Sequence, residues 1–304
     1  MKKTKTTVIE SSNLPSISQD QLSTVYDTGN IVEVITASHQ YQNLAAYRKI
    51  DKNHFVNTET GEIGCFKHSN GKVSQSSLSR TFANLRRTIN ENFVGDNSEL
   101  FVTLTYARLT TDTTQVRNDF KHFIASLRRY VSVEYIVCIE PQNSGSWHLH
   151  VLLKRFDNVK LTISKPLMDK LWRHGITHIE RLPFADNFGA YFTARLIDVD
   201  ELEEYGKHSE HGQKKSIIKG QRLKFYPAGL HIFRCSKGIK RPIPKRLPYS
   251  EVLKMVETLK PCYQTKRNII IKNADGTERT VNEIFYQQFQ KSEGGNHCEE
   301  NNSN

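Results

Sequence analysis

The spacing of apolar residues changes several times along the chain, and each spacing predicts a type of element. Four short apolar runs predict strands in the middle of the sequence, at residues 100–106, 135–140, 147–154 and 176–182. Apolar residues at helical spacing predict two helices between them, at residues 112–127 and 167–174. Asp112 is expected to cap the first and Gly175 to end the second. The apolar side of the first consists of Val116, Phe120, Phe123 or Ile124, and Leu127. The order strand, helix, strand, strand, helix, strand predicts an α+β fold, with a central antiparallel sheet and helices packed on it.

Apolar residues at helical spacing also occur before and after the segment 100–182. Apolar residues from Leu78 to Ile89 predict one helix, whose arginines are expected on a solvated face. A second helix is expected to begin at a cap residue, Asp186 or Asn187, and to run to about Val199. Its core side consists of Phe188, Phe192, Leu196 and Val199. The central sheet therefore has at least four helices available to cover it.

The two ends of the chain give weaker patterns. Residues 1–45 are polar and rich in Ser, Thr and Gln, which predicts little order, and a hairpin is expected at residues 54–66. Residues 250–259 predict a short helix, and residues 268–281 predict a strand followed by an Asp-Gly turn. The last dozen residues are polar and are expected to be disordered.

The net charge of the chain indicates the kind of molecule that it binds. The 304 residues carry a formal net charge of +11, which favours a polyanionic partner, and nucleic acid is the leading candidate. No run of 18 apolar residues and no apolar stretch after the first lysines occurs, so neither a membrane span nor a secretion signal is expected. The five cysteines show no paired spacing, which agrees with the reducing cytoplasm.

Two histidines with one residue between them carry the candidate chemistry. Because strand side chains alternate between faces, His148 and His150 point the same way, and the turn before them brings Glu140 close to His148. This pair is expected on an outward face, opposite the buried residues of the same strand. Two imidazoles and a carboxylate can chelate one divalent cation. A structural zinc site is not favoured, because no Cys-x-x-Cys pair completes it.

Two further features bear on nucleic acid. In the helix after the sheet, Tyr191 and Arg195 lie one turn apart on the same side, although the pattern alone makes Tyr191 a residue at the edge of the core. From Gly212 to Ser250 the chain has eleven Lys or Arg and no acid. The aromatic residues among these cations suit single-stranded DNA, and the alternative is a basic surface with ordinary core aromatics. The expected DNA-contacting residues are Lys214, Lys215, Lys219, Arg222, Lys224, Arg234, Lys237, Lys240 and Arg241.

Three blocks in chain order resemble the HUH superfamily of rolling-circle replication initiators, especially those of Gram-positive plasmids, integrative elements and related phages. The strand from Phe101 to Tyr106 resembles the first motif, Glu140 with the segment 147–150 resembles the metal motif, and the helix with Tyr191 resembles the nucleophile motif. The resemblance covers roughly residues 78–245. It implies an HUH nuclease fold, which is RRM-like or ferredoxin-like.

The resemblance also implies roles for these residues. His148, His150 and Glu140 would bind Mg²⁺ or Mn²⁺, and Tyr191 would attack the DNA phosphate with Arg195 as a helper cation. The products would be a 5′-phosphotyrosine link and a free 3′-OH, and the reverse reaction would religate the strand. Single-stranded or origin DNA is the implied substrate. Because no Walker-type loop occurs, unwinding would come from a host helicase and extension from a host DNA polymerase.

The chain departs from the family pattern at two positions. Many initiators have a lysine three residues after the tyrosine, where this chain has Ala194, and some have a second tyrosine where this chain has Arg195. A two-tyrosine relay is therefore not expected. Tyr205 is a rival nucleophile, but the acidic residues around it would repel a phosphate.

The domain division expected on this basis has four parts. They are a polar N-terminal extension with a hairpin (1–77), the HUH endonuclease domain (78–210), a basic DNA-contacting region (211–290) and a disordered tail (291–304). Two alternatives stay open. A conjugative relaxase or transposase would use the same chemistry, although relaxases commonly group three histidines and often place the tyrosine before them. A DNA-binding replication regulator would have the sheet without the reaction.

Overall fold

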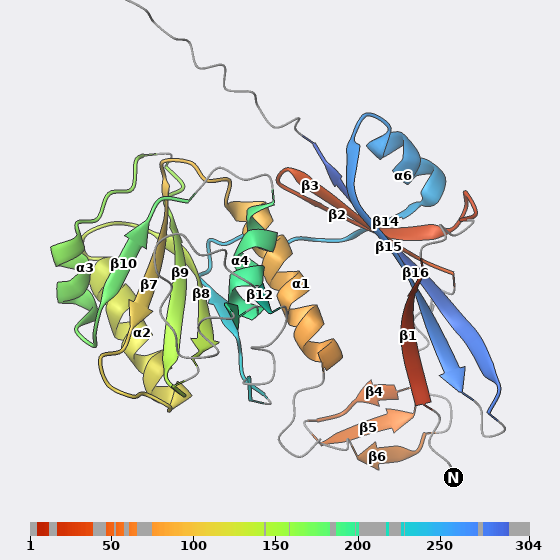
Figure 1. The fold of residues 1–304 in the computed structure, drawn as a ribbon, viewed down its shortest axis with the longest axis horizontal. Coiled ribbons are helices and arrows are strands. Elements are labelled where there is room, and N and C mark those ends of the chain that lie inside the picture. Colours follow the sequence, from red (N-terminus) through yellow and green to blue (C-terminus); the bar gives the residue numbers. More distant parts are fainter. Residues whose placement is uncertain are drawn as a thin grey trace, which may run out of the picture. The chain divides into compact units, whose positions relative to one another are not determined.

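Figure 1 shows the fold in a computed structural model of the chain. The structure describes residues 5–11, 17–38, 47–51, 53–57, 61–65, 75–142, 144–157, 159–182, 187–197, 199–200, 217–218, 226–227, 229–272 and 276–291. The helices are α1 (Gln75–Asn92), α2 (Thr113–Leu127), α3 (Lys165–Trp172), α4 (Phe188–Ile197) and α6 (Tyr249–Val256).

The strands of the described residues form four sheets. The central sheet contains β7 (Glu99–Thr105), β8 (Glu134–Pro141), β9 (Trp147–Lys154), β10 (Thr177–Glu180) and β13 (Phe233–Cys235). A larger sheet contains β1 (Lys5–Ser11), β2 (Leu22–Thr28), β3 (Ile31–Ala37), β14 (Lys245–Pro248), β15 (Lys260–Lys272) and β16 (Glu278–Gln290). Two small sheets contain β4 (Tyr47–Lys49), β5 (His54–Asn57) and β6 (Ile63–Cys65), and β11 (Val199–Asp200) with β12 (Ile217–Ile218).

The chain divides into two compact units. One unit contains residues 1–27, 32–72 and 243–293, and the other contains residues 28–31, 73–242 and 294–304. The second unit holds the central sheet. Residues expected in the N-terminal extension and in the basic C-terminal region share the larger sheet, because β2 pairs with β14 and β1 pairs with β15.

The central sheet confirms the predicted α+β architecture. Its strand order is β10-β7-β9-β8-β13, and each of its strand pairs is antiparallel. The predicted hairpin is β8 and β9, with Glu140 directly opposite His148. Gly145 has a φ of 82°, a conformation that glycine adopts at low cost in the turn. The sheet therefore fixes which residues of the hairpin share a face.

Both faces of the central sheet are buried. On one face, α2 and α3 cover apolar residues such as Val151 and Leu149, and α2 buries every residue predicted for its apolar side. On the other face, α1 and α4 cover Phe101, Ile136 and Leu152 (Figure 1). Burial on both sides explains the continuous apolar run of β9, where four consecutive residues from Leu149 to Leu152 are buried.

The helix ends partly differ from the sequence predictions. Asp112 caps α2 as predicted, since its carboxylate accepts a hydrogen bond of 2.8 Å from the Thr114 amide. The predicted end of α3 at Gly175 was wrong, because Arg173 takes the left-handed position with a φ of 61°. Gly175 has another role. A Cβ there would lie 2.2 Å from the carbonyl oxygen of Thr105, so the glycine allows the chain to pass close to β7.

The larger sheet corrects the expectation that residues 1–45 have little order. Strands β1, β2 and β3 lie in this segment, and Val25, Val32 and Val34 are buried against Val252 and Phe289. The predicted helix near residue 250 is confirmed as α6, and the expected strand near residue 268 is part of the long β15–β16 hairpin. The hairpin expected near residue 60 is also confirmed, since β5 pairs with β6.

The arginines of α1 are less exposed than predicted. Arg80 lies on the solvated face, but Arg87 is 6% exposed and belongs to the buried residues of the helix. The acidic stretch with Tyr205 and the C-terminal tail lie outside the described residues. Among the helices of the described part of the chain, none has the length and apolar character needed to cross a bilayer.

Removing the Leu152 side chain should destabilise the second unit. Leu152 is fully buried, so we expect Leu152→Ala to lower the free energy of unfolding by about 2–5 kcal/mol. Both tryptophans, Trp147 and Trp172, lie in this unit, so the fluorescence change in urea reports on it. The matched control is Leu109→Ala at a position that is 68% exposed, which should change stability by less than about 0.5 kcal/mol. Equal effects of the two substitutions would contradict the assigned core.

Candidate metal centre and nucleophile helix

The β8–β9 hairpin brings three metal-ligating side chains together. Glu140 pairs with His148 across the hairpin, and His150 lies two residues further along the same strand. One side-chain ligand atom from each of Glu140, His148 and His150 lies within 4.8 Å of the other two. This separation suits three ligands around one cation, so the three ligands expected from the sequence lie in one cluster.

The cluster is more buried than the sequence analysis predicted. Glu140 is 4% exposed and His150 is 8% exposed, so the expectation of an outward-facing pair was wrong. The reason is the helix layer on this face. The imidazole of His150 stacks on Phe101 at 5.6 Å between ring centroids and meets the edge of Phe192 of α4 at 6.3 Å. Two of the three ligands are therefore buried, and His148 is half-buried.

Neighbouring polar groups orient both imidazole rings. The side-chain amide of Gln142 lies with its nitrogen 3.0 Å from Nδ1 of His148, and the Thr103 hydroxyl lies 3.3 Å from Nδ1 of His150. In metal sites, such partners hold the ring and fix which nitrogen faces the cation. When the amide oxygen of Gln142 is turned toward the ring, it accepts the Nδ1–H proton and leaves the Nε2 lone pair of His148 for a cation.

The chemistry of the donor set fits a divalent cation. Nε2 of His150 is in contact with a carboxylate oxygen of Glu140. Nε2 of His148 is buried and has no hydrogen-bond partner within the described part of the chain. A buried nitrogen of this kind is costly unless something binds it, and a metal ion is the simplest partner. Two nitrogens and one carboxylate leave further coordination positions for water and phosphate oxygens.

The protonation state of His148 favours metal binding. Burial, and after it the neighbouring His150 ring, lowers the pKa of His148 to about 4. The imidazole is therefore neutral at physiological pH and keeps its lone pair without having to lose a proton first.

Helix α4 lies on the same face of the sheet as the metal ligands. Phe192 of α4 packs against both Phe101, at 5.5 Å between centroids, and His150. Tyr191 is the residue before Phe192, and it is 51% exposed. The nucleophile expected from the sequence thus lies on the helix that covers the ligands, with its side chain accessible to solvent. Arg195 lies in α4, and its side chain is outside the described part.

Contacts with α1 fix the position of α4. The amide of Gly189 donates a hydrogen bond of 2.7 Å to the Asn90 side chain, which also donates to Asn187 at 3.0 Å. A Cβ at Gly189 would lie 2.3 Å from the carbonyl oxygen of Arg86 in α1. The glycine therefore allows the two helices to approach closely. Asn187 caps α4 as expected, although the helix ends at Ile197 rather than near Val199.

The predicted DNA-contacting residues are only partly described. Arg234 is half-buried on β13, and Lys237, Lys240 and Arg241 are exposed in the segment that follows. The other five, Lys214, Lys215, Lys219, Arg222 and Lys224, lie outside the described residues.

The aromatic residues of the basic segment have mixed positions. Tyr226 is only 3% exposed and packs edge-on against Phe82, so it is a core residue rather than a stacking platform for bases. Phe233 is half-buried, and the guanidinium of Arg241 lies 5.8 Å from its ring centroid.

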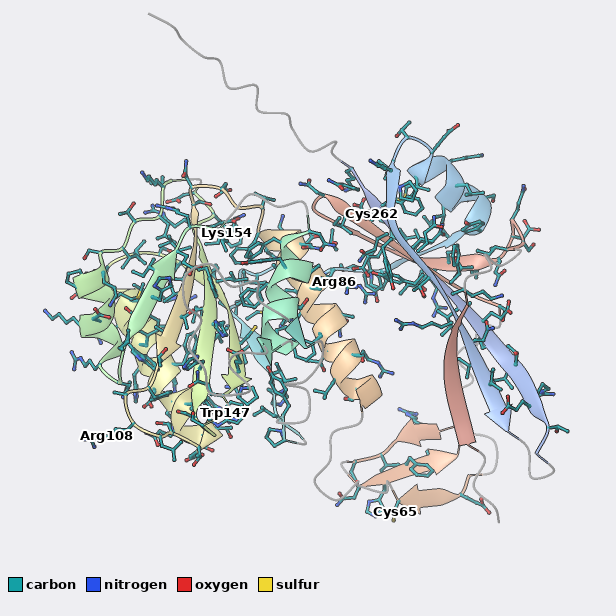
Figure 2. The ribbon with its side chains drawn as sticks, viewed as in Figure 1. Cys65, Arg86, Arg108, Trp147, Lys154 and Cys262 are labelled. Atoms are coloured by element: carbon teal, nitrogen blue, oxygen red, sulfur yellow. The ribbon has the colours of Figure 1, made fainter. Side chains whose placement is uncertain are left out.

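Sequence reasoning missed the residues that support the ligands. Thr103, Gln142 and Phe192 were not selected as parts of the metal site. Thr103 lies opposite His150 because β7 pairs with β9, a pairing that the sequence analysis did not predict. Phe192 was assigned only to the core, and no pattern in the sequence indicates that its ring meets a ligand. In Figure 2, Trp147 and Lys154 label the two ends of β9, the strand that carries both histidines.

A family comparison covers the same region. Residues 99–198 match a family model that describes replication-associated proteins of the ORF2 and gene-2-protein type. The matched stretch includes β7, the β8–β9 hairpin and α4, and therefore contains all three ligands and Tyr191. This part of the chain is therefore similar to replication-associated proteins, which agrees with a replication initiator. No curated protein and no solved structure matches the chain.

Loss of any one ligand should weaken metal binding. We expect His148→Ala, His150→Ala and Glu140→Gln each to reduce Mn²⁺ affinity by more than about tenfold in calorimetric titration, because even supporting residues of metal sites contribute this much. His178→Ala is the matched control, since this histidine of β10 is exposed and pairs with Glu180. Unchanged Mn²⁺ binding in the three ligand variants would show that the cluster is not the site.

The lowered pKa of His148 predicts a pH dependence of stability. Between pH 6.5 and about 4, the unfolded chain carries a proton on this residue that the folded chain lacks. The free energy of unfolding of the metal-free protein should therefore decrease as the pH falls through this range, and this loss should level off below it. Urea titrations of wild-type protein and His148→Gln measure the effect, and the variant should show the shallower pH dependence. Equal pH dependence of the free energy of unfolding in wild-type protein and His148→Gln would contradict this prediction.

Proposed function

We propose that this protein is a rolling-circle replication initiator of the HUH type, which nicks one strand of origin DNA and later religates it. The observation that carries the proposal is the juxtaposition of a buried His-His-Glu cluster with a helix that contacts a ligand ring and presents an exposed tyrosine one residue away. The stretch with the family match contains all of these elements.

The proposed reaction is a transesterification at phosphorus. The Tyr191 oxygen forms a bond to the phosphorus of one phosphodiester, and the bond from that phosphorus to the 3′ oxygen breaks. The phenolic proton leaves Tyr191, and the departing 3′ oxygen gains a proton. The products are a 5′-phosphotyrosine link and a free 3′-OH. Because a phosphodiester is replaced by another phosphodiester, a later 3′-OH can reverse the reaction and religate the strand.

The cation and the protein have separate tasks. Mg²⁺ or Mn²⁺ held by His148, His150 and Glu140 would stabilise negative charge on the phosphate oxygens. Glu140 and His150 are buried, so the dielectric around them is lower than in water, which strengthens their electrostatic interactions. The exposed side chain of Tyr191 is accessible to an unpaired strand. Arg195, one turn later on the same helix, is the candidate for stabilising the phenolate.

The remaining partners follow from the product. A free 3′-OH is a primer, so a host DNA polymerase and a host helicase are the expected partners, in the cytoplasm. The family match favours an initiator over a conjugative relaxase or transposase with the same chemistry.

A covalent-adduct assay tests the proposed reaction. The full-length protein is incubated with Mn²⁺ and a degenerate pool of single-stranded oligonucleotides, and adducts are separated by denaturing electrophoresis. We expect wild-type protein to form an adduct that EDTA prevents. Tyr191→Phe should reduce the adduct at least about 10³-fold while DNA binding is retained, because the nucleophilic oxygen is lost.

Matched tyrosine variants make the assay specific. Tyr130→Phe removes a hydroxyl from another exposed tyrosine and should leave the adduct unchanged. Tyr205→Phe tests the rival nucleophile, and peptide mapping of the adduct identifies the linked residue directly. An adduct on Tyr205 would replace the assigned nucleophile. Binding of DNA without any adduct in Mn²⁺ would favour the non-catalytic regulator instead.

A further inference from the structure

A pocket lies on the opposite face of the central sheet from the metal ligands. It is a shallow hollow that is half open to solvent, so a ligand would lie across its mouth. Val137, Ile139 and Leu149 of the hairpin form its apolar floor, and Val116 and Phe120 of α2 form a wall. Leu149 lies between His148 and His150 in sequence, so the floor is the reverse side of the strands that carry the metal ligands.

Two arginines line the same pocket. Arg117 extends from the exposed side of α2, and Arg234 is half-buried on β13, where it pairs in register with Val137 of the floor. Neither guanidinium has a carboxylate partner within the described residues. The two charges are close enough to repel each other, since burial and then the charge of Arg117 lower the pKa of Arg234.

Two guanidiniums without a carboxylate partner among the described residues thus line one apolar hollow. An anion between the guanidiniums would relieve their repulsion, and the planar donor groups of arginine match phosphate geometry. The apolar floor requires that the same ligand also carry a non-polar, preferably flat, group. A nucleotide combines these two features.

We propose that this pocket binds one nucleotide unit, with its phosphate between Arg117 and Arg234 and its base against the apolar floor. The ligand comes either from a DNA strand or from the pool of free nucleotides. This site is separate from the nicking reaction, because its residues face away from the metal ligands, and its occupancy does not require Tyr191 or a cation.

An acidic peptide is a weaker match to the pocket. A carboxylate would satisfy the arginines, but a peptide would also bring backbone polar groups onto a floor that offers only apolar side chains from Val137, Ile139 and Leu149. The base of a nucleotide can cover the half-buried Ile139 and stack on the arginine planes without that cost. The net charge of +11 also favours phosphates over neutral ligands.

Calorimetric titration of the metal-free, full-length protein with 5′-dAMP tests the site. We expect saturable binding that Arg117→Gln and Arg234→Gln each weaken about tenfold or more, as for lost hydrogen bonds to a charged group. Lys121→Gln is the matched control. It removes the same charge from an exposed position of α2 outside the pocket and should change the affinity less than about twofold.

Two smaller probes separate the two halves of the ligand. Deoxyadenosine lacks the phosphate, and inorganic phosphate lacks the base, so each should bind at least about tenfold more weakly than dAMP. Equal binding of either probe would overturn the proposal, as would unchanged dAMP binding in both arginine variants. Binding of a glutamate-rich peptide in place of dAMP would also overturn it. Because Arg117 is exposed, its variant is expected to fold, and thermal melting verifies this.

A single-stranded hexanucleotide distinguishes the two sources of the ligand. If the pocket holds one unit of a strand, the hexamer binds more tightly than dAMP, and Arg117→Gln weakens both. If the pocket is a free-nucleotide site, the hexamer binds no better than dAMP. The adduct assay with Tyr191→Phe is independent of these titrations, so failure of the pocket proposal leaves the nicking proposal intact, and the reverse also holds.

Discussion

The antiparallel register of β8 and β9 is the constraint on which the candidate site depends. Glu140 faces His148 across the hairpin, and Cys138 faces His150, so the three ligands share one face. Because side chains alternate along a strand, a slip of one residue would move one strand's ligands to the opposite face. The register is held by apolar residues on both sides, since Leu149 and Val151 belong to one core and Leu152 to the other. The same packing that stabilises the unit therefore sets the geometry of the metal ligands.

The helices that bury the ligand-bearing face of the sheet affect both the stability of the unit and the protonation of the ligands. Helices α1 and α4 close this face of the sheet, and Phe101 and Phe192 enclose the imidazole of His150. The low-dielectric surroundings keep His148 uncharged and strengthen electrostatic interactions within the cluster. The cost is a buried nitrogen, Nε2 of His148, that has no hydrogen-bond partner among the described residues. Helix α4 has two roles, because Phe192 packs against the ligand His150 and the preceding residue, Tyr191, is the proposed nucleophile.

Sequence patterns predicted the elements whose structure depends on residues close together in the chain. Alternation in β9 and the turn before it gave the hairpin and its three ligands, and helical spacing gave α2 with its full apolar side. Contacts between distant segments were not predictable in this way. The closure of the histidine face depends on Gly189 approaching Arg86, which is far from it in the sequence. The first strand of the chain, β1, pairs with β15 near the other end of the chain. Helix α3 ends at Arg173, which adopts the left-handed conformation that the sequence analysis expected at a glycine, Gly175.

The pairing of β1 with β15 has a consequence for synthesis of the chain. Lys5 lies opposite Lys272, so the N-terminal strand leaves the ribosome long before its partner is translated. The segment 73–242, which holds the central sheet and the candidate site, is complete in the nascent chain before that partner appears. Domains generally fold as units during translation, in order of their appearance. Until residue 272 emerges, the early strands have an unpaired edge, which is the kind of surface that chaperones shield from aggregation.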